Sequence, residues 1–381
     1  KGTLPDEFPD ASSIALVAAD PRLAIDEEGS KVAGTLDFMR SNIEHIVYYV
    51  LESRSFDSVV GWLYSGDNPP AINWIPAGQG YSFEGASTTN ENKDAGQPYN
   101  QYVYQSGETG PSTTLDEPTD DPYHGTPDSI FQQWTGGYTA YREGQTADMG
   151  GFVSDNGISS VMGTYNTTQL SVLNTLASEF AISDMWFCGE AGGTTTNRAT
   201  LATGSAFNIT ESYEGGDAYE YCPKAPHRQS MWKVLTNHGI TDWAIYYSVL
   251  WENYPYTYHL FLEGQLPSVD QYPGQHVQPI QSFFEDVENQ TLPAFSFLEP
   301  VWFVPNEPFT SYHPTGNVLA GEEGLKKIYD AISQSDYYWD KTALVISFSK
   351  GGGIYDHVAA KPMMKAWPND GLDGYEFDTT G

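Results

Sequence analysis

The sequence predicts an α/β fold with a mostly parallel central sheet and helices on both of its faces. Residues 46–51 and 343–348 are continuous apolar runs rich in β-branched and aromatic side chains, which is typical of strands buried on both faces. Segments with helical spacing alternate with such runs along the chain. That alternation favours a parallel sheet, because parallel strands are joined by crossover helices.

Each element has its own local signal. Ser55 follows the first strand as a candidate N-cap, before apolar residues at helical spacing, and Gly239 stands where a helix over 230–238 would end. Further helices are expected over 169–180 and 322–333 and directly after Gly193. The remaining strands are expected over residues 181–187, 243–249 and 293–298.

The organisation favours one large domain. The 381 residues contain no internal repeat and no convincing linker. We expect an irregular N-terminal arm over residues 1–40 and a single domain over 41–381. Within that domain, the region from about 65 to 128 is rich in Gly, Pro, Ser, Thr, Asn and Asp, so a loop-rich insertion is expected there.

The charge excludes two classes of partner. Asp and Glu total 50 against 17 Lys and Arg, so the formal net charge is −33. A protein this acidic repels nucleic-acid phosphates and anionic lipid headgroups. No apolar run approaches the ~20 residues that a membrane-spanning helix needs.

Several features predict a secreted glycoprotein. The chain starts at Lys1 without the apolar core of a signal peptide, as a processed N-terminus would. Three sequons, at Asn166, Asn208 and Asn289, are candidate glycosylation sites. Cys188 and Cys222 would form one disulfide in an oxidising compartment, or remain two buried thiols; the sequence leaves both open.

Three polar clusters follow predicted strand ends, at residues 52–57, 193–198 and 349–358. In this order and spacing they resemble the phosphoesterase family of acid phosphatases and phospholipases C, which belongs to the alkaline-phosphatase-like superfamily. No single motif is decisive, but further landmarks occur in the family's order, at residues 121–124, 149–152, 298–300, 313–314 and 321–322. The resemblance runs from about Asn42 to the last residue and implies a three-layer α/β/α sandwich.

The resemblance also implies roles for individual residues. Thr194 stands at the family's nucleophile, and His124 and His313 match histidines near the reacting phosphate. A divalent cation in such a site helps a hydroxyl to lose its proton and stabilises the developing phosphoryl charge. The family's phosphate-side pair corresponds to Asn197 and Arg198, and its metal ligands include the positions of Glu52 and Asp356.

The remaining metal-ligand positions depart from the family pattern. Ser53 replaces an Asn, and Ser349 and Lys350 replace an acidic pair. Two unit charges ~4 Å apart interact by about 4 kcal/mol at an effective dielectric near 20, and a divalent cation doubles the repulsion from an ammonium. We therefore expect no cofactor at the family metal site, with Lys350 pairing with Glu52 instead.

Three functions follow as alternatives. The first is a phosphoesterase-like pseudoenzyme with a binding or structural role, its many aromatic residues, such as Trp243, Tyr246 and Tyr247, lining a groove for an apolar or pigment-like molecule. Thr194 would then only cap a helix, and the two histidines would be structural.

The second alternative is an active metal-dependent acid phosphatase or phospholipase C with Thr194 as nucleophile. The third is a storage or matrix glycoprotein that binds surface calcium loosely through acidic loops at residues 116–121 and 370–374.

The end of the chain carries one more expectation. In the family, the segment that residues 377–381 resemble is followed by another buried strand and further helices. A sheet that ended there would leave an edge open. We therefore expect the C-terminal part of the fold to be missing from this chain and to be supplied by a second polypeptide.

Overall fold

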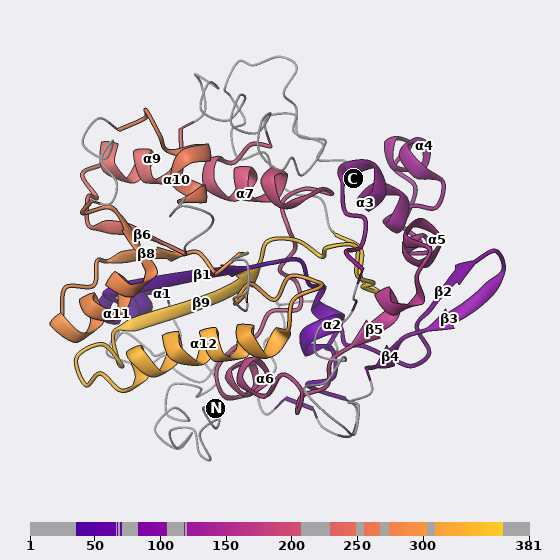
Figure 1. Ribbon diagram of the computed structural model, residues 1–381, viewed down its shortest axis with the longest axis horizontal. Coiled ribbons are helices and arrows are strands. Elements are labelled where there is room, and N and C mark those ends of the chain that lie inside the picture. Colours follow the sequence, from indigo (N-terminus) through magenta and orange to yellow (C-terminus); the bar gives the residue numbers. More distant parts are fainter. Residues whose placement is uncertain are drawn as a thin grey trace, which may run out of the picture.

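A five-stranded parallel sheet forms the centre of the protein (Figure 1). The computed structural model describes residues 36–65, 67, 69–70, 83–104, 118, 120–206, 229–248, 255–266, 274–302 and 309–360. The strand order β7-β6-β8-β1-β9 confirms the predicted fold class. The strands are β1 (His45–Leu51), β6 (Trp243–Tyr247), β7 (Val277–Pro279), β8 (Phe295–Leu298) and β9 (Thr342–Phe348).

Helices cover both faces of this sheet because successive strand residues point to opposite sides. Val47, Tyr49 and Leu51 of β1 enter one apolar cluster, whereas Val50 enters the other. The two layers are visible above and below the sheet in Figure 1. The first cluster includes α6 (Ser171–Glu179), α11 (Ile280–Asn289) and α12 (Val318–Ser333), and the second includes α7 (Thr194–Thr203), α9 (Met231–Asn237) and α10 (Tyr256–Phe261).

A smaller group of elements lies beyond the carboxyl end of β1 (Figure 1). It has its own apolar cluster, which includes Phe152, Met162 and Tyr355. The predicted insertion contributes a hairpin that its polar composition did not indicate. The elements here are α2 (Phe56–Val60), β2 (Glu91–Asp94), β3 (Gln97–Asn100), β4 (Tyr102–Val103), α3 (Thr126–Gln133), α4 (Gly137–Arg142), α5 (Phe152–Asn156), η3 (Ser159–Met162) and β5 (Gly163–Thr164).

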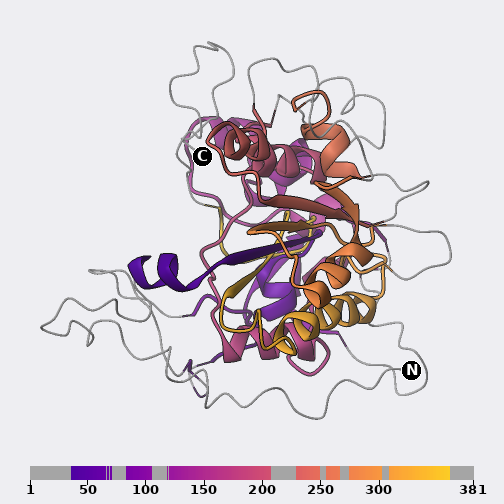
Figure 2. The same cartoon turned by 90° about the vertical axis from the view of Figure 1, so that its left-hand side faces the viewer.

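The start of the described chain is helical. Helix α1 (Leu36–Asn42) precedes β1 and projects away from the layers (Figure 2), so the last residues of the predicted arm are ordered as a helix. The other residues of the arm lie outside the described part. Among the described helices, none has the length and apolarity needed to cross a bilayer.

Two expectations were wrong. Residues 181–187 form no strand, and their apolar side chains include Trp186, which is 63% exposed. The aromatic residues of β6 do not line a groove, because Trp243, Tyr246 and Tyr247 are each at most 2% exposed within the core. Their apolar character reflects a strand buried on both faces.

Strand β9 is an edge of the described sheet, and its side chains are only half-buried except for Ser347. A cavity of about 910 Å³ lies beside it. Apolar side chains line much of this trough, among them Phe180, Trp339, Leu344, Ile346 and Phe348. The predicted second polypeptide, which would cover such an edge, stays a prediction.

Glu322 joins the helices α6 and α12. Its carboxylate, on α12, accepts hydrogen bonds from the backbone N–H groups of Val172 and Leu173 at 2.5 and 3.1 Å, and from the Tyr312 hydroxyl at 2.6 Å. Val172 and Leu173 lie in the first turn of α6, whose N-cap residue Leu170 provides no side-chain acceptor. Glu322 therefore satisfies donors that the helix leaves unpaired.

Replacing Glu322 with Ala should lower the free energy of unfolding by about 3 kcal/mol. The substitution leaves buried hydrogen-bond donors without an acceptor, and each unsatisfied donor costs about 1–3 kcal/mol of stability. Denaturant unfolding of Glu322→Ala beside Glu323→Ala measures this, since Glu323 is the exposed neighbour on the same helix. Equal stabilities of the two variants would contradict the capping role.

Candidate functional site

The candidate site lies where β1 and β9 end, opposite the start of α7. Glu52 directly follows β1 and is fully buried, and Ser349 and Lys350 directly follow β9. Gly352 lets the two strand-end loops approach each other. Its φ is 67°, and a Cβ at this position would lie 2.6 Å from the carbonyl oxygen of Ser53, so a larger residue would push the loops apart.

Glu52 is the centre of this site. Its Oε1 accepts hydrogen bonds from Nε and Nη2 of Arg198 at 2.8 and 2.6 Å, and its Oε2 accepts one from Thr194 Oγ1 at 3.0 Å. Burial alone would raise the pKa of Glu52, but the charges of Arg198 and Lys350 and the hydrogen bonds from Arg198 outweigh burial and hold the pKa below its usual range. Glu52 is therefore an anion whose two oxygens both accept hydrogen bonds.

Lys350 is buried near this anion but forms no ion pair with it, so the expected pairing of Lys350 with Glu52 is wrong. The residue is 2% exposed, and its Nζ has no hydrogen-bond partner among the described residues. Burial lowers the pKa of Lys350 to about 8, against the opposing attraction of Glu52 and Asp121, so the ammonium form prevails at neutral pH. Within the same described residues, Ser349 Oγ is also a buried polar atom without a partner.

His124 and His313 lie near each other, with ring centroids 6.1 Å apart. Each ring uses Nδ1 on a backbone carbonyl, of Pro122 at 2.5 Å and of Pro314 at 2.8 Å. Burial and the charge of Lys350 lower the pKa of His124 to about 4 and also lower that of His313. Both rings are neutral at pH 7.

The predicted phosphate-side pair has other contacts here. Asn197 donates to the carbonyls of Gly192 and Gly193 and accepts from the backbone of Glu190, so it braces the loop before α7. Arg198 bonds Glu52, and its guanidinium lies 3.9 Å from the ring centre of Trp302. Of this pair, Arg198 alone is tied directly to the Glu52 anion.

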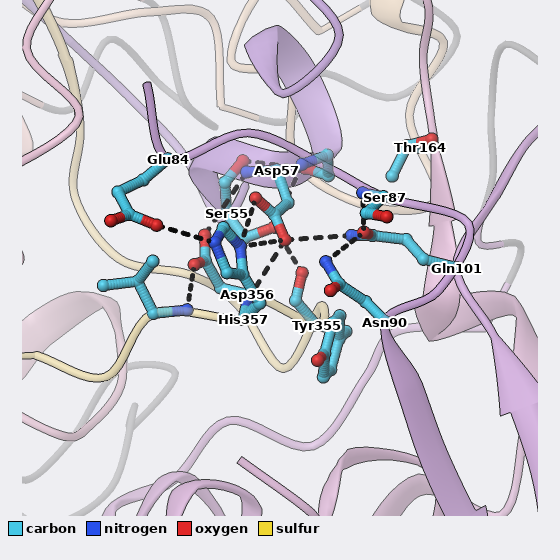
Figure 3. Close-up of polar contacts among 12 residues, drawn as sticks. Ser55, Asp57, Glu84, Ser87, Asn90, Gln101, Thr164, Tyr355, Asp356 and His357 are labelled. Carbon is cyan, nitrogen blue, oxygen red and sulfur yellow. Dashed lines mark hydrogen bonds and ion pairs between the residues drawn. The ribbon is translucent and has the colours of Figure 1, made fainter. Parts of the chain in front are cut away.

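A second polar group contains Asp356, the other predicted metal ligand (Figure 3). Its oxygens accept from the backbone N–H groups of Asp57 and Val358 at 3.3 and 2.9 Å. The ring of His357 lies between Asp57, 3.0 Å from Nδ1, and Glu84, 3.1 Å from Nε2. Hydrogen bonding to Asp57 raises the pKa of His357 to about 9, and burial raises that of Asp356 to about 7.

Hydrogen bonds in this second group link three segments that are far apart in the sequence. Asp57 also accepts from Gln101 at 3.0 Å, and Ser55 donates to the carbonyl of Tyr355 at 2.8 Å (Figure 3). The loop after β1, the loop after β9 and the insertion are thus held together. Asp57 was not predicted as a site residue; its place in the 52–57 cluster was the available signal.

The residues at the family's metal position do not fit a divalent cation. Glu52 already holds Arg198 and Thr194, and the Asp356 oxygens already accept from two backbone N–H groups. The other positions offer two hydroxyls, of Ser53 and Ser349, and the ammonium of Lys350. Hard or borderline cations are held in proteins mainly by carboxylates, carbonyls, imidazoles and thiolates. An ammonium has no lone pair to offer and repels the cation.

Among the described residues, two groups of side chains have the composition of metal ligands. They are Asp57 with Asp356 and His357, and Asp121 with His124 and His313; within each group one ligand atom per residue lies within 4.8 Å of the others. Such groups do not support the expectation of no cofactor at the family metal site, since Asp356 belongs to one of them. In the first group the carboxylates already accept hydrogen bonds, and a protonated His357 cannot ligate.

The predicted modification sites are only partly described. Asn289 is exposed and Asn166 half-buried, whereas Asn208 lies outside the described residues. The Sγ atom of Cys188 lies 3.3 Å from the carbonyl oxygen of Glu190. Cys222 and the acidic loop at 370–374 also lie outside the described part. Glycosylation, the disulfide and surface calcium stay predictions.

Comparison with known proteins agrees with this geometry. Residues 43–380 match the Phosphoesterase family, which covers most of the chain. The chain belongs to this family. The resemblance derived from the strand-end clusters is thereby confirmed.

Several curated relatives have names that give an activity. The chain is 29% identical to Non-specific phospholipase C6 of Arabidopsis thaliana over 90% of its length and 60% of that protein. It is 26% identical to Non-specific phospholipase C3 of the same plant, over 90% of the chain and 62% of the relative. Phospholipase C B of Mycobacterium tuberculosis is 24% identical, over 84% and 60%. The chain thus spans about three-fifths of the length of these relatives.

Proposed function

We propose that this protein binds phosphoesters beside Thr194, with the ammonium of Lys350 as the cation of the site at neutral pH. The burial of Lys350 beside Glu52, without a partner for Nζ in the described part of the chain, carries the proposal. Glu52, Arg198 and Lys350 are each at most 2% exposed, and their charges sum to +1. A buried surplus of positive charge favours an anionic ligand.

Two neighbouring features support an anion in this place. Thr194 is the first residue of α7, and its N-cap Gly193 has no side chain to occupy the helix N-terminus. The N–H groups and dipole of a helix start favour negative charge. Ser349 Oγ adds a buried hydroxyl donor from the β9 side. The names of the relatives support a phosphoester as the anion.

We infer that turnover through the family's metal position is lost. Catalysis there needs a cation that acts as a Lewis acid and helps the hydroxyl to ionise. The ammonium of Lys350 supplies charge and hydrogen bonds but no vacant orbital. The proposed role is therefore recognition of a phosphoester by a secreted pseudoenzyme. An apolar or pigment-like ligand stays a prediction without support from the buried aromatic residues of β6.

The second candidate is hydrolysis with Thr194 as nucleophile. One observation favours it: the Thr194 hydroxyl donates to Glu52 Oε2 at 3.0 Å, and a hydroxyl bonded to a carboxylate is a recurring arrangement of nucleophile and base. The relatives named as phospholipases C support the same reading. Against it, the pKa of Glu52 is held below its usual range, which makes Glu52 a weak base.

Replacing Lys350 with Met should weaken binding of an aryl phosphate at least about tenfold, because a hydrogen bond to a charged group contributes about 1.5–3 kcal/mol. Titration calorimetry at constant ionic strength measures the affinity. Lys327→Met is the matched control, since Lys327 is an exposed lysine of α12. Equal affinities in the two variants would refute Lys350 as the cation of the site.

Phosphate release from the same aryl phosphate separates the two candidates. With and without added Zn²⁺ or Mn²⁺, we expect negligible and equal rates in the native protein, Thr194→Ala and Thr200→Ala. Thr200 lies on the same helix and bonds the Thr196 carbonyl, away from Glu52. Activity that disappears only in Thr194→Ala would establish the hydrolase and overturn the loss of turnover.

A further inference from the structure

Glu299 is a second buried carboxyl group near Arg198, outside the contacts that form the site. It directly follows β8 and is 1% exposed. The parallel register pairs Tyr49 with Leu298, and continued by one residue it places Glu299 beside Val50. Neighbours in a parallel register point to the same face of the sheet, which here is the face that α7 and α10 cover.

The contacts of Glu299 reach both of these helices. Its Oε1 accepts a hydrogen bond from the backbone N–H of Thr257, in the first turn of α10, at 2.7 Å, whereas its Oε2 has no hydrogen-bond partner among the described residues. Arg198 of α7 attracts the carboxylate but donates to Glu52 and to the carbonyl of Val50. Arg198 thus acts on two buried carboxyl groups and is bonded to one of them.

The protonation state of Glu299 sets the net charge of the buried groups. Four ionisable side chains of the site are each at most 2% exposed, namely Glu52, Arg198, Lys350 and Glu299. Their charges sum to zero when Glu299 is ionised and to +1 when it is protonated. A singly charged phosphodiester therefore leaves a buried net charge beside the ionised form but none beside the protonated form. Because uncompensated charge is costly away from water, the second combination is favoured.

We propose that Glu299 takes up one proton from solvent when the site binds a phosphodiester, so that the anion and the proton bind together. This inference rests on the proposed function and adds the residue that couples it to pH. Burial raises the pKa of Glu299 above its usual range, against the opposing effects of Thr257 and Arg198. The unpartnered Oε2 is the oxygen that can carry the proton.

The groups that surround Glu299 come from several elements. Arg198 of α7 is the charged group that acts on it, and Glu52 and Lys350 follow β1 and β9, the next two strands of the sheet. His259 of α10 is occupied by Glu263, 2.8 Å away. The other polar side chains packed here are uncharged at neutral pH, namely Tyr247 of β6, Thr257 of α10 and Trp302 after β8.

Titration calorimetry with methyl nitrophenyl phosphate tests the proposal, because this diester carries a single charge over the whole range from about pH 5 to 7. In that range Lys350, with a pKa of about 8, stays largely protonated. We expect the affinity of the native protein to fall about tenfold from pH 5 to 7, because the proton that binding requires becomes scarcer. Binding enthalpies in buffers of different ionisation enthalpy should show an uptake that approaches one proton.

Glu299→Gln keeps the shape of the side chain but cannot take up the proton. Its affinity should change less than about threefold over the same pH range, and the proton uptake should disappear. Glu288→Gln is the matched control, because Glu288 is an exposed residue of α11, and it should behave as the native protein does.

The outcomes separate this inference from the proposed function. Absence of saturable binding at every pH would refute the proposed function and this inference with it. Binding with the same pH dependence in the native protein and Glu299→Gln would refute this inference alone. If Glu299→Gln fails to fold, the native protein decides, since binding without proton uptake between pH 5 and 7 overturns the proposal.

Discussion

The buried carboxylate of Glu52 imposes the constraint on which the arrangement of the site depends. An ionised group with no exposure must be compensated by charge and hydrogen bonds, or it would take up a proton. Arg198 meets most of this need through two hydrogen bonds from α7, and Thr194 at the start of the same helix supplies a third. The end of β1 and the start of α7 are thereby locked together.

Because Arg198 already neutralises Glu52, Lys350 brings a surplus of charge. In the family that the chain belongs to, the resemblance assigns this place to a metal cation, which needs several anionic or neutral ligands around it. Here three of the ligand positions have become two hydroxyls and an ammonium, while Glu52 and Asp356 keep their carboxylates. The ammonium is part of the Lys350 side chain, so the site is positive without binding any ion. Replacing a metal cation by the ammonium of Lys350 keeps the attraction for an anion but removes the Lewis acid.

The sequence predicted the sheet well because its central strands are apolar on both faces. Most side chains of β1 are buried, so its central placement followed from its apolar sequence. The similar apolar run of β9 forms a strand as predicted, but this strand is the edge of the described sheet and its side chains are mostly half-buried. The hairpin of β2 and β3 was not predictable in this way. Its strands are polar, and its turn places Ala95, with a φ of 45°, in a conformation that alanine rarely adopts. Residues 181–187 gave the opposite error. A strand was predicted there because the segment is apolar, but several of its residues line the trough beside β9 instead.

The candidate site was predictable at the level of its strand-end clusters but not of its contacts. Glu52 and Lys350 lie at one edge because carboxyl ends of parallel strands share one edge of a sheet. Thr194 and Arg198 reach Glu52 from the start of α7, and the strand expected before that helix is absent. The bond between Asp57 and His357 spans 300 residues, and no local spacing indicates it. Ser53 has a left-handed backbone conformation, with a φ of 56°. Asn, which the family has at this position, is several-fold enriched in that conformation among the non-glycine residues.

The central claim is that a protonated Lys350 stands beside neutral imidazoles in the site. NMR titration of the histidine rings, in the native protein and in Lys350→Met with a chelator present, tests it most directly. The account predicts that burial and Lys350 hold the pKa values of His124, near 4, and His313 below 6.5 in the native protein, and that both rise in the variant. Ordinary values that do not change on substitution would contradict the account, because they would place the ammonium of Lys350 away from the site.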